Sequence, residues 1–257
     1  MNKTKAITVL LMLMAGTVFA QDLTGLDIMT KVYERPTGDD MTADLSMTLE
    51  NSRGDQRIRE LKQYIKDFGQ MEKKIMFFMA PADIKNTSFM NWSYADETKN
   101  DDQWIYLPAL KKVKRISSDS SGDYFMGSDF TYDDLGDRHP MQDTHTILKE
   151  EIIEGINCYV VESVPKDEDY MYSRTVTWVI KDKWIGLKKE FYDEDDDLLK
   201  RLILNDYKEF NSIIVITSVT MKNEQKNHQT EMTLSNVKIN SGISDTQFTE
   251  RMMKRGL

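Results

Sequence analysis

Two histidines and a serine are the first residues to consider as a metal-binding or catalytic set. His139, Asp143 and His145 lie close together, and imidazole and carboxylate groups are common ligands of divalent metals. Their spacing matches no metal-binding motif, and both histidines flank a loop-like stretch, so a solvated loop explains them better. Ser128 does not stand in the G-x-S-x-G pattern of a nucleophile elbow. We therefore expect no enzyme, although a catalytic triad assembled from distant residues stays an alternative.

An acidic run and a single cysteine do not indicate a metal-binding or catalytic site either. Asp193–Asp197 is the strongest acidic run, but a calcium loop needs spaced oxygen ligands and a glycine turn, and this run has neither. We interpret it as a solvated hairpin tip. Cys158 is the only cysteine, so the chain forms no internal disulfide, and its strand-like surroundings predict a small buried side chain. No glycine-rich phosphate loop occurs, and we expect no cofactor.

A ligand-binding region is the stronger prediction, and its residues gather between Asp101 and Asp134. A short apolar strand ends at Pro108 and is followed by a basic cluster and then by an aromatic loop that contains glycines. Acyl chains need a wide apolar cavity with few polar groups, and a mobile loop can serve as its lid. We expect Trp104 on the sheet and Phe130 on the loop to face one shared cavity; packing in an ordinary core is the alternative. The predicted ligand-binding residues are Trp104, Tyr106, Phe125, Met126 and Phe130.

The basic cluster is unusual because the rest of the chain is acidic. The formal net charge is −9. Removal of residues 1–20, which contain Lys3 and Lys5, would take it to −11. This balance argues against nucleic acid as a partner. Lys112, Lys114 and Arg115 allow two interpretations. They protect a solvated edge strand from aggregation, or they contact anionic lipid headgroups or an acidic partner, which predicts transient membrane contact.

Residues 1–20 have the pattern of a secretory signal peptide. Lys3 and Lys5 precede an apolar stretch, and Val18-Phe19-Ala20 has the small-x-small pattern of a cleavage site. We expect cleavage after Ala20 and export to the periplasm, without a lipid anchor because no cysteine follows the cut. Residues 21–257 suit a single β-rich domain, and they contain no further apolar run long enough to span a bilayer.

The hydrophobic pattern predicts a mainly antiparallel β fold. Residues 24–35 have helical spacing behind a Thr24/Asp27 capping box, and short helices are expected over 131–135 and 244–253. Residues 41–50 alternate between apolar and polar side chains, as a strand with one wet face does. From Tyr124 to Gln142 no period holds, and such long connections are usually functional or mobile. Strands are also expected over 57–66, 71–79, 88–94, 103–107, 147–153, 157–164, 174–180, 184–192, 198–210, 213–223 and 229–239. A sheet this large must curl, close or stack, so barrel, sandwich and half-barrel all remain open.

Four motifs resemble one known family. They are WIYLPALKKVKRI at 104–116, YFMGSDFTYDDL at 124–135, ERPTGDDMTADLSMTL at 34–49 and FMAPADIKNTSFMNW at 78–92. Together they resemble the LolA-like outer membrane lipoprotein-sorting protein family, from about Asp22 to the C-terminus. The resemblance implies a curved, unclosed antiparallel half-barrel of the LolA/LolB type with helices on its concave face.

The resemblance also implies lipid or lipoprotein handling. We expect a periplasmic carrier that shields the acyl chains of a lipoprotein or lipid cargo and ferries them between membranes, with a membrane transporter as donor. Two alternatives come from other classes: a hydrolase that acts on lipid in the same pocket, and a sensor that binds a lipid signal and regulates a partner. The sequence does not identify the cargo, its partners, the direction of transfer or the oligomeric state.

Overall fold

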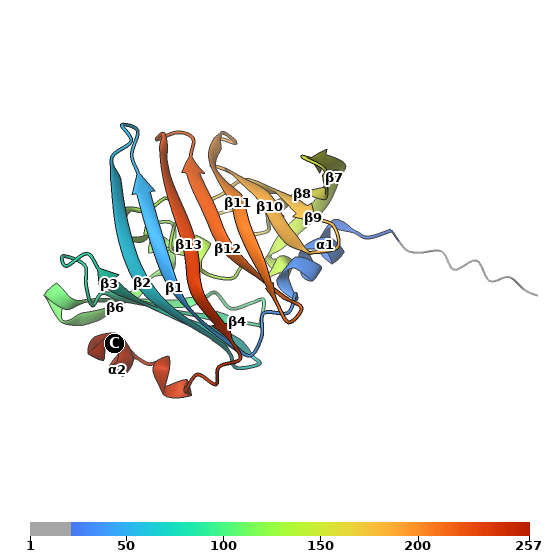
Figure 1. The fold of residues 1–257 in the computed structure, drawn as a ribbon. Helices are drawn as coiled ribbons and strands as arrows, with labels where there is room; N and C mark the ends of the chain where they lie inside the picture. The colour runs from blue at the N-terminus through green and yellow to red at the C-terminus, as the bar shows by residue number, and fades with distance from the viewer. Residues whose placement is uncertain (1–21) are drawn as a thin grey trace, which may run out of the picture.

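The backbone forms one large antiparallel sheet that does not close on itself (Figure 1). The computed structural model describes residues 22–257, so the predicted signal peptide and its cleavage after Ala20 lie outside the described residues. The sheet has 13 strands in the order β6-β5-β4-β3-β2-β1-β13-β12-β11-β10-β9-β8-β7. The strands are β1 Asp40–Glu50, β2 Gln56–Asp67, β3 Met71–Ala80, β4 Ser88–Tyr94, β5 Asp102–Leu107, β6 Lys112–Ile116, β7 Asp143–Ile153, β8 Ile156–Pro165, β9 Arg174–Ile180, β10 Ile185–Tyr192, β11 Leu198–Phe210, β12 Ile213–Asn223 and β13 His228–Ile239. The predicted fold class, a mainly β and unclosed antiparallel sheet, is confirmed.

The alternation predicted for the first strand is present in β1. Ala43, Leu45, Met47 and Leu49 are buried, while the residues between them are only half-buried. The register with β2 and β13 then places the facing side chains of both neighbours on the same concave face. β3 differs, because Ile75–Phe78 is buried on both faces. A strand is buried in this way only where both sides of the sheet are covered.

Helix α1, Gly25–Tyr33, covers one end of the concave face. It begins at the predicted capping box, in which Thr24 and Asp27 bond each other's backbone N–H groups. Ile28 is its most buried residue and packs against Val161 and Val179 of the sheet. Gly25 allows this close approach, because a Cβ there would lie 2.7 Å from the backbone of β7.

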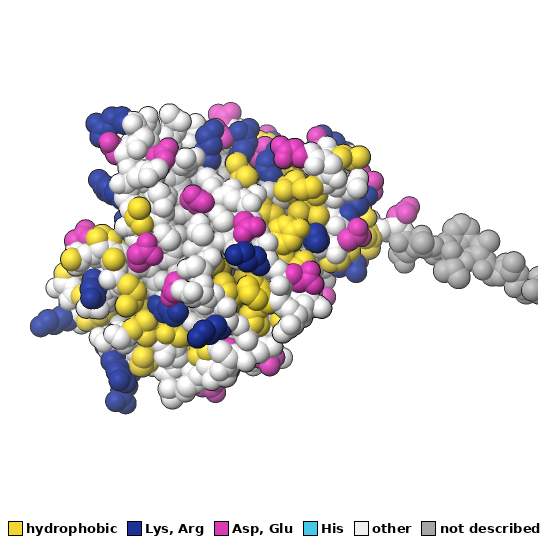
Figure 2. Space-filling model, in the orientation of Figure 1, with side chains coloured by type: hydrophobic (Ala, Val, Ile, Leu, Met, Phe, Trp, Pro, Cys, Tyr) yellow, Lys and Arg dark blue, Asp and Glu magenta, His cyan; other side chains and the backbone are white. Residues whose placement is uncertain are grey.

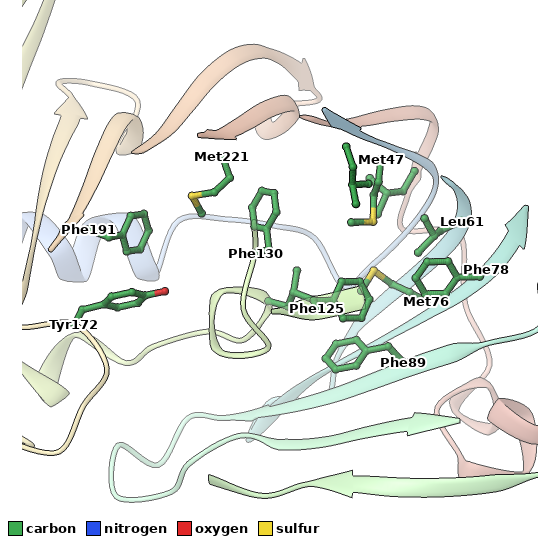
Figure 3. Close-up of a cluster of buried hydrophobic side chains, with 13 residues drawn as sticks. Met47, Leu61, Met76, Phe78, Phe89, Phe125, Phe130, Tyr172, Phe191 and Met221 are labelled. Atoms are coloured by element: carbon green, nitrogen blue, oxygen red, sulfur yellow. The ribbon is translucent and has the colours of Figure 1, made fainter. Parts of the chain in front are cut away.

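A long connection fills the middle of the same face. We call residues 117–142, between β6 and β7, the plug; its short 3-10 turns are η2 Ser118–Ser120, η3 Phe125–Gly127, η4 Asp133–Leu135 and η5 Pro140–Gln142. Figure 3 shows Phe125 and Phe130 of the plug inserted among side chains from both halves of the sheet. Phe125 is fully buried and Phe130 is 5% exposed. The segment was expected to be a mobile lid; it is instead packed into the core of the concave face.

Buried polar contacts hold the plug against β11 and β13. Lys200 is fully buried, forms an ion pair with Asp134 and donates to the Asp129 carbonyl at 3.3 Å. The Asp129 carboxylate accepts from the Thr230 hydroxyl at 2.7 Å and contacts His228 Nδ1 at 2.7 Å. Polar groups are retained inside a protein when each has partners, as these do.

The C-terminal segment lies on the other face of the sheet. Helix α2, Glu250–Arg255, follows the turn η6, Asp245–Gln247. Phe248 and Met253 pack against Ile75, Phe77 and Met90, whereas the intervening Met76 belongs to the cluster around the plug. The expected position of helices on the concave face therefore applies to α1 and not to α2 (Figure 1). Neither α-helix in the part of the chain that the structure describes is long and apolar enough to cross a bilayer.

We predict that Lys200→Met destabilises the fold by about 3–5 kcal/mol, because it leaves the buried Asp134 carboxylate without its cation. The matched control is Lys222→Met on β12, whose side chain is 41% exposed and pairs with Glu224; partly exposed pairs contribute only about 0–1 kcal/mol. Urea unfolding of both variants measures the difference. Equal losses in the two variants would show that the buried pair does not hold the plug.

Candidate ligand cavity on the concave face

A cavity of about 460 Å³ lies between α1, the end of the plug and the sheet. Ligand pockets in proteins usually measure about 300–1,000 Å³, so one drug-sized ligand fits here. Side chains from α1, β1, β2, β12 and β13 form its apolar wall. These are Met29, Val32, Met41, Ile65, Val215 and Leu234.

One end of the cavity carries charges of both signs. Arg35 donates to the Ile214 carbonyl at 2.8 Å, and Lys74 donates to the Leu135 carbonyl at 3.1 Å. Asp137 lines the cavity, although its side chain keeps contact with solvent. Partial desolvation and then the nearby Glu72 carboxylate raise the pKa of Asp137 to about 6. Arg35 and Lys74 are therefore matched at this end by Asp137 and Glu72, so it offers an anion little net attraction.

The opposite end contains Lys189 of β10 and a histidine whose two ring nitrogens are both bonded. His145 Nε2 lies 2.8 Å from the Pro140 carbonyl oxygen, which can only accept, so Nε2 carries the proton. Nδ1 then accepts from the Ser163 hydroxyl at 2.8 Å. Burial lowers the pKa of His145, which keeps the ring neutral near pH 7.

The loop with candidate metal ligands has other partners. Asp143 accepts two hydrogen bonds from Arg138, at 2.9 and 2.6 Å. His139 accepts from the Met141 backbone N–H at 3.2 Å at the start of η5. Within residues 22–257, no three His, Cys, Asp or Glu side chains come together as a metal site.

The five predicted ligand-binding residues fall on two faces of the sheet. Phe125, Met126 and Phe130 belong to the packed cluster around the plug. Trp104 and Tyr106 belong to the cluster under α2. None of the five lines the larger cavity. The prediction that Trp104 and Phe130 share a cavity is wrong, because side chains alternate along β5 and the plug packs on the face opposite to Trp104.

Trp104 does line a second, smaller cavity on the outer face. This cavity measures about 300 Å³ and lies between the sheet and the C-terminal segment. The Trp92 and Trp104 rings meet edge to face at 4.9 Å, and Lys73 Nζ lies 3.9 Å from the Trp92 ring centroid. Figure 2 shows hydrophobic side chains with Lys and Arg around them on the part of this face near α2.

The predicted basic rim lies on the edge strand β6. Lys112, Lys114 and Arg115 are all exposed. Arg115 pairs with Asp102 of the neighbouring strand, whereas Lys112 and Lys114 have no carboxylate within 4 Å among the described residues. Since β6 ends the sheet, both predicted roles, protection of an edge and contact with a partner, remain compatible with its position.

Sequence reasoning missed the residues that line the larger cavity. Arg35 is the second residue of the motif at 34–49, and Asp137 and Arg138 follow the motif at 124–135; none was considered as a binding residue. Lys189 could have been found, because it is two residues from Phe191 and so shares its face of a strand. A lysine on the apolar face of a strand indicates that its charged group has a role in the interior of the protein.

Comparisons with known proteins agree with this architecture. A family model described as "Uncharacterized protein" matches residues 70–255. The structure of a DUF1329 family protein from Desulfovibrio piger has a TM-score of 0.84 and 31% identity, and the match covers 89% of this chain and 97% of that chain. No curated protein matches the sequence.

Two further structures extend the comparison. A protein described as an outer membrane lipoprotein-sorting protein domain, from Vibrio parahaemolyticus, has a TM-score of 0.84 and 33% identity, over 90% of this chain and 98% of that chain. A LolA superfamily protein from Nitrosomonas europaea has a TM-score of 0.70 at 18% identity, over 90% of this chain and 99% of that one, which is a likeness of fold. The chain therefore belongs to the LolA-like outer membrane lipoprotein-sorting protein family.

Proposed function

We propose that this protein is a periplasmic carrier that binds an acyl chain of a lipoprotein or lipid in the concave cavity and moves it between membranes. The observation that carries the proposal is the cavity of about 460 Å³, with its apolar wall, on the concave face of a LolA-like sheet. The family name of the Vibrio parahaemolyticus relative, lipoprotein sorting, supports the same class of cargo and the same compartment.

The cavity explains how such a carrier would hold its cargo. Each CH₂ group moved from water to an apolar wall stabilises the complex by about 0.8 kcal/mol. Met29 and Val32 on α1 face Val215 and Leu234 from the sheet across this space. Release then requires an acceptor that offers the chain a better site, and a membrane transporter is the partner we propose on the donor side. Phe125 and Phe130 do not line the cavity; in this proposal they anchor the plug in the core next to it.

A second candidate function rests on the His145–Ser163 pair. A neutral imidazole that accepts from a serine hydroxyl is the arrangement of a serine nucleophile and its base, and both residues line the cavity. Against this, the third member is a carbonyl and Ser163 is only 3% exposed. Steady hydrolysis of a p-nitrophenyl acyl ester that Ser163→Ala abolishes would establish a lipid hydrolase; a carrier gives no turnover.

We predict that Val32→Trp blocks acyl-chain binding, because the indole would occupy the space beside the apolar wall. Affinity for a fluorescent fatty acid should fall about tenfold or more, which corresponds to about 1.4 kcal/mol. The matched control is Ile58→Trp, on a side chain that is 55% exposed and does not line the cavity. Titration of both variants against wild type decides the matter. If the folded Val32→Trp protein binds the fluorescent fatty acid as tightly as wild type does, the acyl chain does not bind in this cavity.

The basic rim gives a separate prediction for membrane or partner contact. Lys112→Glu combined with Lys114→Glu should slow lipid transfer to anionic vesicles severalfold, because the unpaired lysines become repulsive. The effect should shrink with added salt, since charges are screened over about 8 Å at 0.15 M. Lys85→Glu with Lys208→Glu, both exposed, makes the same change of charge elsewhere. Equal transfer rates in the two double variants would leave the rim with a protective role at the edge strand alone.

A further inference from the structure

We propose that the cargo carries an anionic headgroup, a carboxylate or a phosphate, and that Lys189 binds this group inside the concave cavity. The inference rests on the proposed function, in which the same cavity holds an acyl chain, and it adds the chemistry of the head. The ligand would therefore be an anionic amphiphile with its chain along the apolar wall.

The register of β10 directs Lys189 into the concave space. Lys189 lies opposite Leu202 of β11 and Thr177 of β9, and it shares a face with Phe191, which belongs to the core around the plug. Its Nζ is 5.0 Å from the Phe191 ring centroid. The side chain is one of those that line the cavity of about 460 Å³.

The acidic groups that act on Lys189 are already bonded to other donors. Asp143 accepts from Arg138 at 2.6 and 2.9 Å. Asp134 pairs with the buried Lys200, and Asp133 accepts from the Tyr170 hydroxyl. Among residues 22–257, no carboxylate lies within 4 Å of Lys189 Nζ.

A half-buried ammonium group without a carboxylate in contact gains from an anion that binds beside it. Burial lowers the pKa of Lys189, as does the positive charge of Arg138, while Asp143, Asp134 and Asp133 act in the opposite direction without contacting Nζ. An anionic headgroup beside Nζ would favour the charged form again. An anionic ligand would therefore stabilise the charged form of Lys189.

The rest of the cavity lining determines how the ligand lies. Asp137 and Glu72 stand toward the other end and would repel an anion. Arg35 and Lys74 at that end already donate to backbone carbonyls. Val215 and Leu234 also line the cavity and offer apolar surface to a chain. The headgroup therefore belongs at Lys189 and the chain along these residues.

The test compares amphiphiles that differ only in the head. Dodecanoate, dodecyl phosphate and dodecanol compete with a fluorescent acyl probe on the full exported protein. Wild type should bind at least one of the two anions about tenfold or more tightly than the alcohol, a difference of about 1.4 kcal/mol. The tighter of the two anions identifies the head as carboxylate or phosphate.

Lys189→Met should bind the anions no more tightly than the alcohol, with its affinity for dodecanol retained, and Lys189→Arg should restore the preference. The matched control is Lys188→Met, because Lys188 points to the outer face, where it bonds Glu190 at 3.1 Å and covers the Trp178 ring. If Lys189→Met does not fold, Lys189→Gln gives the same readout.

Two outcomes would overturn the inference: equal binding of anion and alcohol by wild type, or a preference that persists in Lys189→Met. Failure of the proposed function looks different, because wild type would then bind none of the three amphiphiles.

Discussion

The buried pair between Lys200 and Asp134 is the interaction on which the rest of this structure depends. An open sheet exposes its whole concave face unless something covers it, and large exposed apolar surfaces lead to association. Here the plug covers the central part, and Lys200, His228 and Thr230 bind its acidic residues from the sheet. Because these contacts fix the plug, Phe125 and Phe130 reach the core and the end of the plug stops beside α1. The cavity is the space that this arrangement leaves.

The two faces of the sheet serve different purposes in consequence. The concave face holds α1, the plug and the larger cavity, and the outer face holds α2 and the aromatic cavity that includes Trp104. Charged side chains also line the larger cavity, among them Asp137 and Lys189. A carrier needs this combination, an apolar wall for a chain and a limited number of polar groups that orient its head.

Much of the fold could be predicted from the sequence, because alternation and turn residues are local signals. The strand over 41–50, the capping box at Thr24 and the irregular stretch from Tyr124 to Gln142 are all found where the pattern placed them. The joining of the two halves into one open sheet could not be read in this way, since it depends on the pairing of β1 with β13 across most of the chain. Family resemblance, rather than pattern, selected the half-barrel.

The site could be predicted only in part, again because its contacts join residues that are far apart in the sequence. Trp104 was predicted to share a cavity with Phe130, but which face of β5 meets the plug depends on the packing of distant residues. Phe130 looked like a lid residue because glycines surround it, yet Asp129 beside it is bonded to β13, a hundred residues away in the chain. Lys189 gave the one local signal, a charge on the same face as Phe191.

The most direct test of the account is to find where an acyl chain touches the protein. A fatty acid with a photoreactive diazirine near its chain end can be bound, irradiated and mapped by mass spectrometry of peptides. Binding in the larger cavity predicts adducts in α1 and in the segments at 136–140 and 214–216, which line it, and their loss when unlabelled dodecanoate competes. Adducts confined to the outer cavity around Trp92 and Trp104, or labelling that no competitor reduces, would contradict it.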